Sequence, residues 1–423
     1  MRVKRKPLSV VLATAYYAPE PTGNAPYAAG LARGLAARGH NVSVLTSFPH
    51  YPEWRVAPGV PRRRTETIDG VSVVRVRSYV PSKPNALTRV VYESLLGLRV
   101  SVCRWSSPDV VVALSPALLT TGIVGARVRI QRSRPALGIW VQDLYTNGVI
   151  ETAGRSGRIG NLAAAIEGGI LRPADGIAVI HDRFRRFVVD ALGVPGERVR
   201  TIRNWSHVAP PREIDVKKVR SALGWSSDVT IVLHAGNMGA KQGLSNVIDA
   251  ARAADRLSAP IKFVLLGDGN QRESLQREAD GSSRVEFIRP LPDAEYAAAL
   301  RAADILLVNE RPGLNESAVP SKLTSYYSSG RPVLAAVGVG SITAQEIESS
   351  AAGVVVPAGD PEALVQAAIQ LRNRPGVSDT LGASGRAFAK RELSEQAAIE
   401  KFEDWLYWLM EARRANRRGT KGA

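Results

Sequence analysis

A glycine-containing loop in the second half of the chain has residue types suited to binding phosphate. Residues 236–243 follow an apolar run and include Gly236, Asn237 and Lys241. Glycine lets the backbone approach a ligand closely, a helix start offers N–H groups to an anion, and the lysine adds a positive charge. The pattern predicts a phosphate-binding loop; a flexible loop with a solvated lysine is the alternative.

The tetrapeptide Pro-Ser-Lys-Leu that ends at Leu323 predicts a second anion site. Proline suits the first turn of a helix, where its missing N–H costs nothing. The N–H groups of Ser321, Lys322 and Leu323 are then expected to be unpaired and to face a diphosphate. Lys322 would add a full charge to the helix dipole, although a lysine on a helix surface is the alternative. Just upstream, Glu310 and Glu316 belong to a polar loop able to reach sugar hydroxyls.

The first half of the chain has a similar pattern of strand, loop and helix. Gly23 and Asn24 come after the first apolar run and before a helical pattern. The backbone at Gly23 is therefore expected to approach a ligand, and an ordinary turn is the alternative. The spacing is not G-x-G-x-x-G, so a dinucleotide fingerprint is absent.

Other polar and aromatic residues are candidates for substrate contact. Asp143 and Tyr145 follow an apolar run, at the place where ligand-binding groups project from parallel sheets. A turn or a helix cap is the alternative for Asp143. His50 and Tyr51 are in a loop with proline and tryptophan, which could contact a substrate or simply pack.

Composition excludes several classes of protein. The chain has 423 residues, 45% of them hydrophobic, which indicates a globular protein of two or three domains. Cys103 is the single cysteine, so an internal disulfide and a cysteine-based zinc site are excluded, and a reducing compartment is expected. The formal charge of +17 favours polyanionic partners, namely nucleic acid, anionic lipid or phosphorylated substrates. No nucleic-acid-binding motif accompanies the charge, so we expect no nucleic acid partner.

The hydropathy pattern contains no uninterrupted apolar run long enough for a transmembrane helix. The basic N-terminus precedes only a short apolar run, which we interpret as a buried strand and not as a signal peptide. Residues 85–105 intersperse leucine and valine with arginine, which is typical of a basic amphipathic helix on an anionic membrane surface. A helix packed on its domain with a charged outer face is the alternative.

Strand and helix patterns alternate along the whole chain, which predicts α/β domains with parallel sheets covered on both faces. Strands are predicted at 8–14, 41–46, 71–77, 109–114, 136–142, 176–180, 199–202, 230–235, 261–266, 284–288, 304–308, 332–336 and 353–356. Proline and polar residues around 208–211 suggest a linker. We therefore predict domains at 1–207 and 208–393, with one site between them, and a C-terminal helix at 394–423 that packs on a domain or meets a membrane.

Taken in order, these segments resemble the retaining GT-B glycosyltransferases of family 4, in particular the colanic-acid and O-antigen branch. The resemblance spans nearly the whole chain, and its order is more specific than any single motif. The matching segments are 16–23, 35–42, 49–54, 142–145, 204–205, 242–244, 266–269 and 320–322. The fold that it implies is two Rossmann-like doubly wound domains facing each other.

The resemblance implies a donor nucleotide sugar in the C-terminal domain and an acceptor in the N-terminal domain. Together with the patterns above, it implies as donor-binding residues Gly23, Gly236, Asn237, Lys241, Ile288, Arg289, Ser321, Lys322, Leu323 and Ser325. The expected acceptor-binding residues are Asn24, His50, Tyr51 and Tyr145. Asp143, Lys322 and Glu316 are expected to take part in catalysis. No metal and no cofactor are expected, because dipoles and basic side chains can offset the leaving group's charge.

The sequence departs from the wider family at two sites. Asn237 stands where an arginine is usual in the glycine loop. Ser325 stands where the second glutamate of a Glu-x7-Glu motif is usual; the first would fall at Ser317, with Glu316 one position away. These departures match the Pro-Ser-Lys branch, but they leave the contacts to ribose and sugar open.

The resemblance implies transfer of a sugar, from UDP in preference to GDP, to a polyprenyl-diphosphate-linked saccharide. Such an enzyme is expected in the cytoplasm, peripheral to the anionic inner face of the cell membrane. Two alternatives stay open at this point. One is a sugar-nucleotide epimerase or hydrolase on the same fold, and the other is a relative that binds nucleotide sugar without catalysis.

Overall fold

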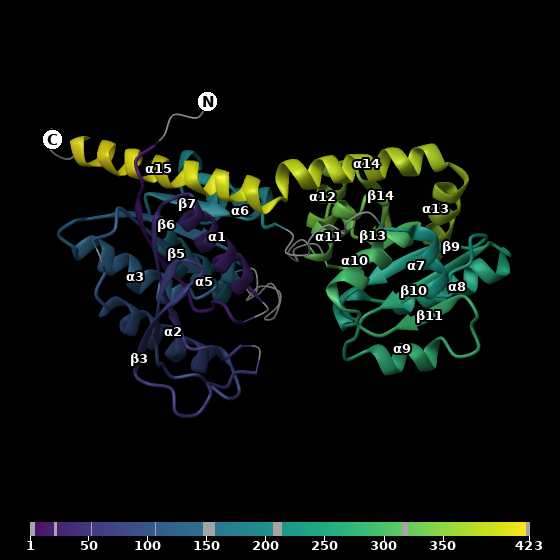
Figure 1. The fold of residues 1–423 in the computed structure, drawn as a ribbon, viewed down its shortest axis with the longest axis horizontal. Helices are drawn as coiled ribbons and strands as arrows, with labels where there is room; N and C mark the ends of the chain where they lie inside the picture. The colour runs from purple at the N-terminus through teal and green to yellow at the C-terminus, as the bar shows by residue number, and fades with distance from the viewer. Residues whose placement is uncertain are drawn as a thin grey trace. The chain divides into compact units, whose positions relative to one another are not determined.

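The computed structural model describes residues 5–20, 23–51, 53–105, 107–146, 157–205, 214–314 and 320–419 (Figure 1). The chain divides into two compact units, each with its own sheet. Unit 1 comprises Met1–Trp205 together with Glu395–Ala423, and unit 2 comprises Ser206–Ser394. Residues 208–211, which we interpreted as a linker, lie outside the described residues.

Unit 1 is an eight-stranded sheet with helices on both faces. Its strands are β1 (Ser9–Ala13), β2 (Asn41–Ser47), β3 (Arg63–Ile68), β4 (Val71–Val76), β5 (Val110–Ser115), β6 (Ala136–Val141), β7 (Gly176–Val179) and β8 (Val199–Thr201). Its helices are α1 (Ala25–Ala37), α2 (Ala86–Ser101), α3 (Leu118–Ile130), α5 (Gly157–Leu171), α6 (Asp182–Asp190) and α15 (Glu395–Gly419), with a 3-10 turn at Gly196–Arg198.

One strand of unit 1 runs against the others. The strand order is β3-β4-β2-β1-β5-β6-β7-β8, and only β3 in it is antiparallel to its neighbour. The sequence pattern predicted a parallel sheet and missed β3, because charged residues at the edge of a sheet break the apolar run that marks a buried strand. Asp69 and Gly70 both have positive φ, 50° and 76°, as a tight hairpin turn requires.

Alternating residues of the unit 1 strands supply two separate cores. In β1, Val11 and Ala13 belong to the core that α2, α3, α5 and α6 cover, whereas Val10 and Leu12 belong to the core under α1 and α15. The C-terminal helix α15 thus completes the unit that contains the N-terminus (Figure 1). Trp405 packs so closely on β6 that a Cβ on Gly138 would lie 2.6 Å from its ring.

Unit 2 is a six-stranded parallel sheet, also covered on both faces. Its strands are β9 (Thr230–Ala235), β10 (Ile261–Leu266), β11 (Val285–Ile288), β12 (Ile305–Asn309), β13 (Val333–Val337) and β14 (Gly353–Pro357). Its helices are α7 (Val216–Ala222), α8 (Ser245–Arg256), α9 (Arg272–Glu278), α10 (Asp293–Ala302), α11 (Lys322–Ser329), α12 (Ile342–Ser350), α13 (Pro361–Asn373) and α14 (Pro375–Glu392), with a 3-10 turn at Ala240–Gln242.

The strand order of unit 2 is β11-β10-β9-β12-β13-β14, so the order reverses between β9 and β12. Open α/β sheets bind ligands at the carboxyl ends of the strands beside such a reversal. In unit 1 the corresponding reversal lies between β1 and β5. Within the described ranges, no helix combines the length and hydropathy that a bilayer span requires.

Candidate active site

The loops after β9 and β10 pack backbone to backbone at the reversal of unit 2. Gly236 and Gly267 directly follow these strands, with φ of 127° and 140°. A Cβ on Gly267 would lie 2.0 Å from the carbonyl oxygen of Gly236, closer than atoms can approach. Met238 N–H donates to the Asp268 carbonyl at 2.8 Å and tightens the contact. The absence of side chains at the two glycines is therefore what allows this arrangement.

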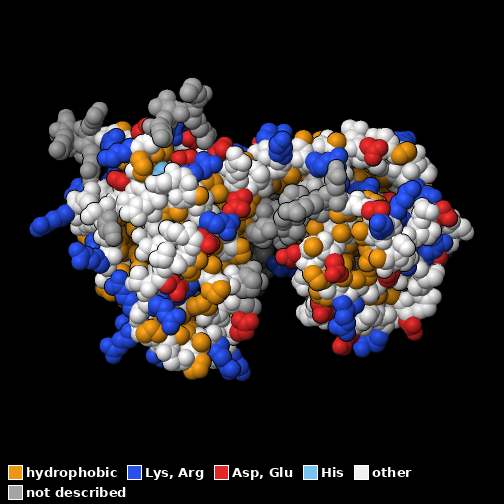
Figure 2. Space-filling model, in the orientation of Figure 1, with side chains coloured by type: hydrophobic (Ala, Val, Ile, Leu, Met, Phe, Trp, Pro, Cys, Tyr) orange, Lys and Arg blue, Asp and Glu red, His pale blue; other side chains and the backbone are white. Residues whose placement is uncertain are grey.

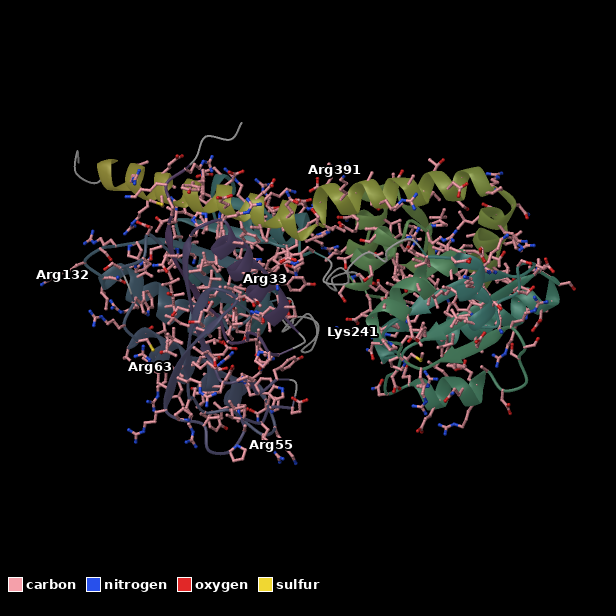
Figure 3. The ribbon with its side chains drawn as sticks, in the orientation of Figure 1. Arg33, Arg55, Arg63, Arg132, Lys241 and Arg391 are labelled. Carbon is pink, nitrogen blue, oxygen red and sulfur yellow. The ribbon has the colours of Figure 1, made fainter. Side chains whose placement is uncertain are left out.

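The remainder of the glycine loop is tied to the end of β12. Arg311 N–H donates to the carbonyl of Lys241 at 2.9 Å, and Asn309 Nδ2 donates to the carbonyl of Gly243 at 2.9 Å. Asn237 and Lys241 are exposed, and Figure 3 shows Lys241 at the surface of unit 2. The loop thus has a fixed backbone with two polar side chains at its surface.

Lys322, the first residue of α11, turns its amino group toward β9. Nζ lies 3.1 Å from Nε2 and 3.4 Å from Nδ1 of His234, and a Cβ on Gly236 would be 3.6 Å away. Lys322 is half-buried as a residue, yet burial of its amino group lowers its pKa to about 7, and Glu310 opposes this shift. The pKa of His234 lies well below its usual range, because the ring is buried and faces the charge of Lys322. An amine of this kind can take up a proton when an anion binds.

Glu310 supplies a buried carboxyl directly after β12. Thr343 Oγ1 donates to its Oε1 at 2.7 Å, and its backbone N–H donates to the carbonyl of Ala336 at 2.9 Å. Burial raises the pKa of Glu310, while the hydrogen bond from Thr343 and the charge of Lys322 act in the opposite direction. The structure therefore places an imidazole and a carboxyl near the amino group of Lys322.

The start of α11 differs in one respect from the prediction. Leu323 N–H donates to the carbonyl of Pro320 at 3.0 Å, so the expectation that it is unpaired is wrong. A tight first turn causes this, because Thr324 N–H likewise bonds three residues back, to Ser321, at 3.2 Å. Among the described residues, neither Ser321 nor Lys322 uses its N–H in a backbone hydrogen bond. Glu316 lies outside the described residues.

Ile288, at the end of β11, has a carbonyl that is already engaged. It accepts from Gly267 N–H at 2.9 Å and from Nη1 of the buried Arg272 at 3.1 Å. Its neighbour Arg289 is exposed. Ser325, in α11, is half-buried and hydrogen-bonds Tyr296, which partly offsets the rise that burial causes in the pKa of that tyrosine.

In unit 1, Gly23 and Asn24 stand at the start of α1, next to the loop of Tyr51. Gly23 has a φ of 67°, and a Cβ on it would lie 3.6 Å from Cε1 of Tyr51. Asn24 is only 7% exposed, and its Oδ1 has no hydrogen-bond partner among the described residues. A buried acceptor of this kind is costly, and a hydroxyl or N–H of a ligand would satisfy it.

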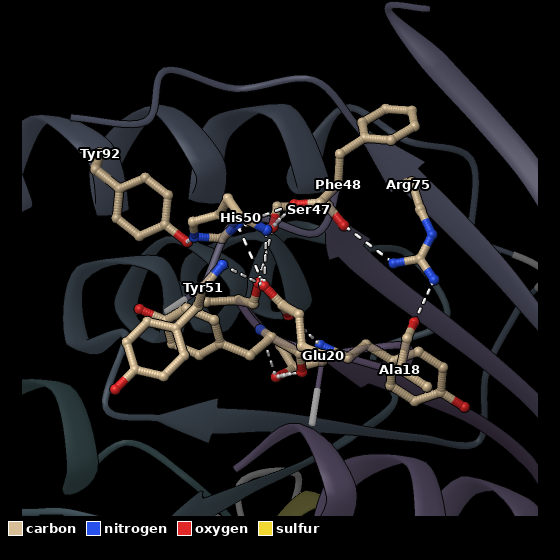
Figure 4. A network of polar contacts seen from close by, with 12 residues as sticks. Ala18, Glu20, Ser47, Phe48, His50, Tyr51, Arg75 and Tyr92 are labelled. Atoms are coloured by element: carbon tan, nitrogen blue, oxygen red, sulfur yellow. Dashed lines mark hydrogen bonds and ion pairs between the residues drawn. The ribbon is translucent and has the colours of Figure 1, made fainter. Parts of the chain in front are cut away.

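His50 belongs to a buried polar network centred on Glu20 (Figure 4). Glu20 Oε1 accepts from the N–H groups of His50 and Tyr51, each at 2.9 Å. The Phe48 carbonyl lies 2.9 Å from His50 Nδ1, and Tyr92 Oη lies 3.0 Å from Nε2. Since a carbonyl only accepts, Nδ1 donates and Nε2 accepts from Tyr92. Burial lowers the pKa of His50, so the ring is neutral and locked in place.

Asp143 and Tyr145 follow β6 in a segment held by two buried carboxylates. The Asp143 side chain is exposed and accepts from Leu144 N–H at 2.9 Å. Tyr145 donates its hydroxyl to Glu93 of α2 and its N–H to Oε1 of Glu167 of α5, the latter at 3.0 Å. Burial raises the pKa of both glutamates, that of Glu93 to about 7.

Similarity to known proteins shows which family this chain belongs to. The WcaI protein of Escherichia coli strain K12, named as a colanic acid biosynthesis glycosyl transferase, is 30% identical over 331 residues, which are 74% of this chain and 79% of that protein. Residues 22–205 match the family described as glycosyl transferase 4-like domain, and residues 229–374 match glycosyl transferases group 1. The chain belongs to glycosyltransferase family 4. It is thus a nucleotide-sugar-dependent glycosyltransferase of that type, as the resemblance implied.

Solved structures confirm the GT-B fold of this family 4 glycosyltransferase. Sucrose-phosphate synthase from Thermosynechococcus elongatus has a TM-score of 0.68 at 18% identity, and the match covers 96% of this chain and 100% of that one. The Anabaena protein Alr3699/HepE, solved in complex with UDP, has a TM-score of 0.67 at 13% identity, covering 95% of this chain and 100% of that one. At such identities the likeness shows the fold alone.

The sequence patterns did not indicate several residues of this candidate site. His234 lies within an apolar strand, and Arg272 lies in a short helix after the second glycine loop, so neither stands out from its neighbours. Glu93 carried a usable signal, because it stands among the apolar residues of the buried face of α2. Asn309 ends β12 and could have been found from its position at the reversal. Among the described residues, no group of three His, Cys, Asp or Glu side chains could hold a metal ion.

Proposed function

We propose that unit 2 binds the diphosphate of a UDP-sugar at the Gly236 loop and the start of α11. The observation that carries this proposal is the enclosed amino group of Lys322 beside Gly236, at the reversal of a parallel sheet. Ser321 and Lys322 add N–H groups at a helix start, and Asn237 and Lys241 add polar side chains. UDP is preferred because HepE, which has the same fold, was solved in complex with UDP.

Transfer in this proposal retains the configuration at the sugar's anomeric carbon. The acceptor oxygen forms a bond to that carbon on the face from which the diphosphate leaves. The carbon–oxygen bond to the diphosphate breaks, and the leaving phosphate oxygen takes the acceptor proton. Lys322 and the helix dipole of α11 stabilise the departing charge. Asp143 orients the acceptor hydroxyl from unit 1, and Asn24 offers its unsatisfied Oδ1 to a sugar hydroxyl.

The proposed acceptor is a polyprenyl-diphosphate-linked saccharide at an anionic membrane surface. The outer face of α2 exposes large apolar side chains, namely Leu87, Val90, Val91, Leu95 and Leu98. Ile159, Leu162 and Ile166 of α5 are also exposed. Figure 2 shows hydrophobic and basic side chains interspersed on the part of unit 1 where Figure 1 places α2. With a net charge of +17, such a face fits an anionic bilayer.

The donor site is tested by Lys322→Met, with Lys390→Met on the exposed face of α14 as the matched control. Isothermal titration with UDP-sugars should show affinity reduced at least tenfold in the first variant and unchanged in the control. A product assay with membrane-extracted lipid acceptor then tests transfer. Donor conversion that needs no acceptor would indicate an epimerase or hydrolase, and binding without any turnover would indicate a non-catalytic relative.

A further inference from the structure

Two buried carboxylates from two different helices accept hydrogen bonds from the residues directly after Asp143. Glu167 of α5 is 1% exposed and accepts from three donors: Tyr145 N–H at 3.0 Å, Thr146 N–H at 3.0 Å and Thr146 Oγ1 at 2.7 Å. Glu93 of α2 is 4% exposed and accepts the hydroxyl of Tyr145. The residues 143–146 are therefore held from both sides.

Glu93 also fixes α2 to its neighbour α3. Its second oxygen accepts from Leu119 N–H at 3.0 Å, in the first turn of α3, and its backbone carbonyl accepts from Thr120 Oγ1 at 2.7 Å. A buried carboxyl costs free energy unless it is well hydrogen-bonded. Packing alone would be served as well by an apolar residue at this position of α2. A carboxylate at this position instead accepts hydrogen bonds from Tyr145 and Leu119, which gives the side chain of Tyr145 one defined position.

The two helices that carry these carboxylates are the same two that expose apolar side chains. On α2, Val91 and Leu95 lie roughly opposite Glu93, since two residues turn a helix by about 200°. They are 41% and 40% exposed. On α5, Leu162 is 62% exposed, on a different face from Glu167. The segment 143–146 is thus attached to the elements that would meet a lipid-linked acceptor first.

We propose that Glu93 and Glu167 are positioning residues that hold Asp143 and Tyr145 in place for the acceptor. This inference rests on the proposed function, because it assigns Asp143 and Tyr145 to the acceptor side. Neither glutamate touches a substrate; each acts through the segment 143–146. Their loss should weaken acceptor use and leave donor binding intact.

The ionisation of Glu93 gives this role a pH signature. Groups from every packed element face it: Arg89 on its own helix, Tyr16 after β1, the hydroxyl of Tyr145 and the helix start at Leu119. Burial is the main cause that raises the pKa of Glu93 to about 7. The ionised form accepts hydrogen bonds from Tyr145 and Leu119 together, so acceptor use should weaken as pH falls through that range.

The experiment compares Glu93→Gln and Glu167→Gln with Glu411→Gln, an exposed control on α15. Steady-state kinetics with a UDP-sugar and membrane-extracted lipid acceptor should show the acceptor KM raised at least tenfold in both variants. The donor Kd should stay within twofold of the wild type. In Glu93→Gln the loss of acceptor affinity below pH 7 should also disappear. The control should match the wild type in all three readouts.

An unchanged acceptor KM, or a donor Kd that changes as much, would overturn the proposal. If the wild type itself transfers no sugar to the lipid extract, the proposed function fails and not the positioning role alone. Tyr145→Phe provides a milder second variant, because it removes only the hydroxyl that donates a hydrogen bond to Glu93. Should the glutamine variants fail to fold, an acceptor KM in Tyr145→Phe equal to that of the wild type rejects the inference.

Discussion

The amino group of Lys322 lies 3.1 Å from Nε2 of His234, and the two residues are 88 positions apart in the chain. The neutral imidazole faces the amine inside unit 2, next to Gly236. A lysine in such surroundings is poised between its charged and neutral forms near neutral pH. At the proposed donor site, this relationship would make the strength of diphosphate binding depend on the protonation of Lys322.

Donor binding should weaken as pH rises through about 7, the value to which burial lowers the pKa of Lys322. The diphosphate favours the ammonium form, so above this pH binding must take up a proton, at a cost of up to tenfold in affinity per pH unit. Titration calorimetry in buffers of different ionisation enthalpy measures that proton. Lys322→Met should bind weakly with no pH dependence between pH 6 and 8.5. A wild-type affinity that stays flat over this range would contradict the assignment.

Removing the Lys322 charge should stabilise unit 2 at low pH. The pKa of Lys322 is lowered from 10.5 to about 7 in the folded state, so the unfolded state binds more protons between these values. The free energy of unfolding therefore rises with pH across this window, and the full destabilisation is present below about 7. We expect Lys322→Met to raise the unfolding free energy at pH 6 by about 1–4 kcal/mol. Urea unfolding of this variant and of Lys390→Met measures the difference.

Gly267→Ala should disrupt the proposed donor site. The new Cβ would lie 2.0 Å from the carbonyl oxygen of Gly236, and φ of 140° is unfavourable for any side chain. The two loops must then separate, which moves Gly236 away from Lys322. We expect donor affinity to fall at least tenfold in calorimetry. Gly281→Ala is the matched control, since Gly281 also has a positive φ, 78°, but open space around it; it should bind donor normally.

Trp405→Ala should destabilise unit 1, although the residue is near the end of the chain. Trp405 is 3% exposed and packs against Phe402 and against Gly138 of β6. Truncating a buried tryptophan costs about 3–5 kcal/mol. Thermal unfolding should show a lowered transition, whereas Tyr79→Ala, at a position 44% exposed, should leave it near the wild type. Equal melting of the two variants would argue against α15 as part of this core.

The outer face of α2 should bind anionic vesicles. Replacing Leu87 and Leu98, which are 73% and 54% exposed, by glutamine removes apolar area without touching the core. We expect partitioning into phosphatidylglycerol vesicles to fall at least tenfold, since each leucine side chain contributes about 1.5–3 kcal/mol when buried. Leu257→Gln on unit 2 is the control. Added salt should weaken wild-type binding as well, because part of the attraction is electrostatic.

Much of the fold could be predicted because the hydropathy periods of strands and helices depend only on residues close together in the chain. The apolar runs placed every strand of unit 2 within a residue or two, and the glycine loop after β9 followed from residue types alone. The edge strand β3 could not be found in this way, since arginines and threonines give no buried run. The Asp69–Gly70 pair, typical of a tight hairpin turn, is the local signal of this strand.

The sequence by itself determined the two-unit α/β architecture and the segments 236–243 and 320–323 as candidates for an anion site. The tertiary structure decided which of their groups are enclosed: the Lys322 amino group is turned inward, and the Leu323 N–H is used within the first turn. It also brought Glu93 to Tyr145, 52 positions along the chain. Burial and pKa depend on contacts between distant segments, so local residue patterns do not contain them.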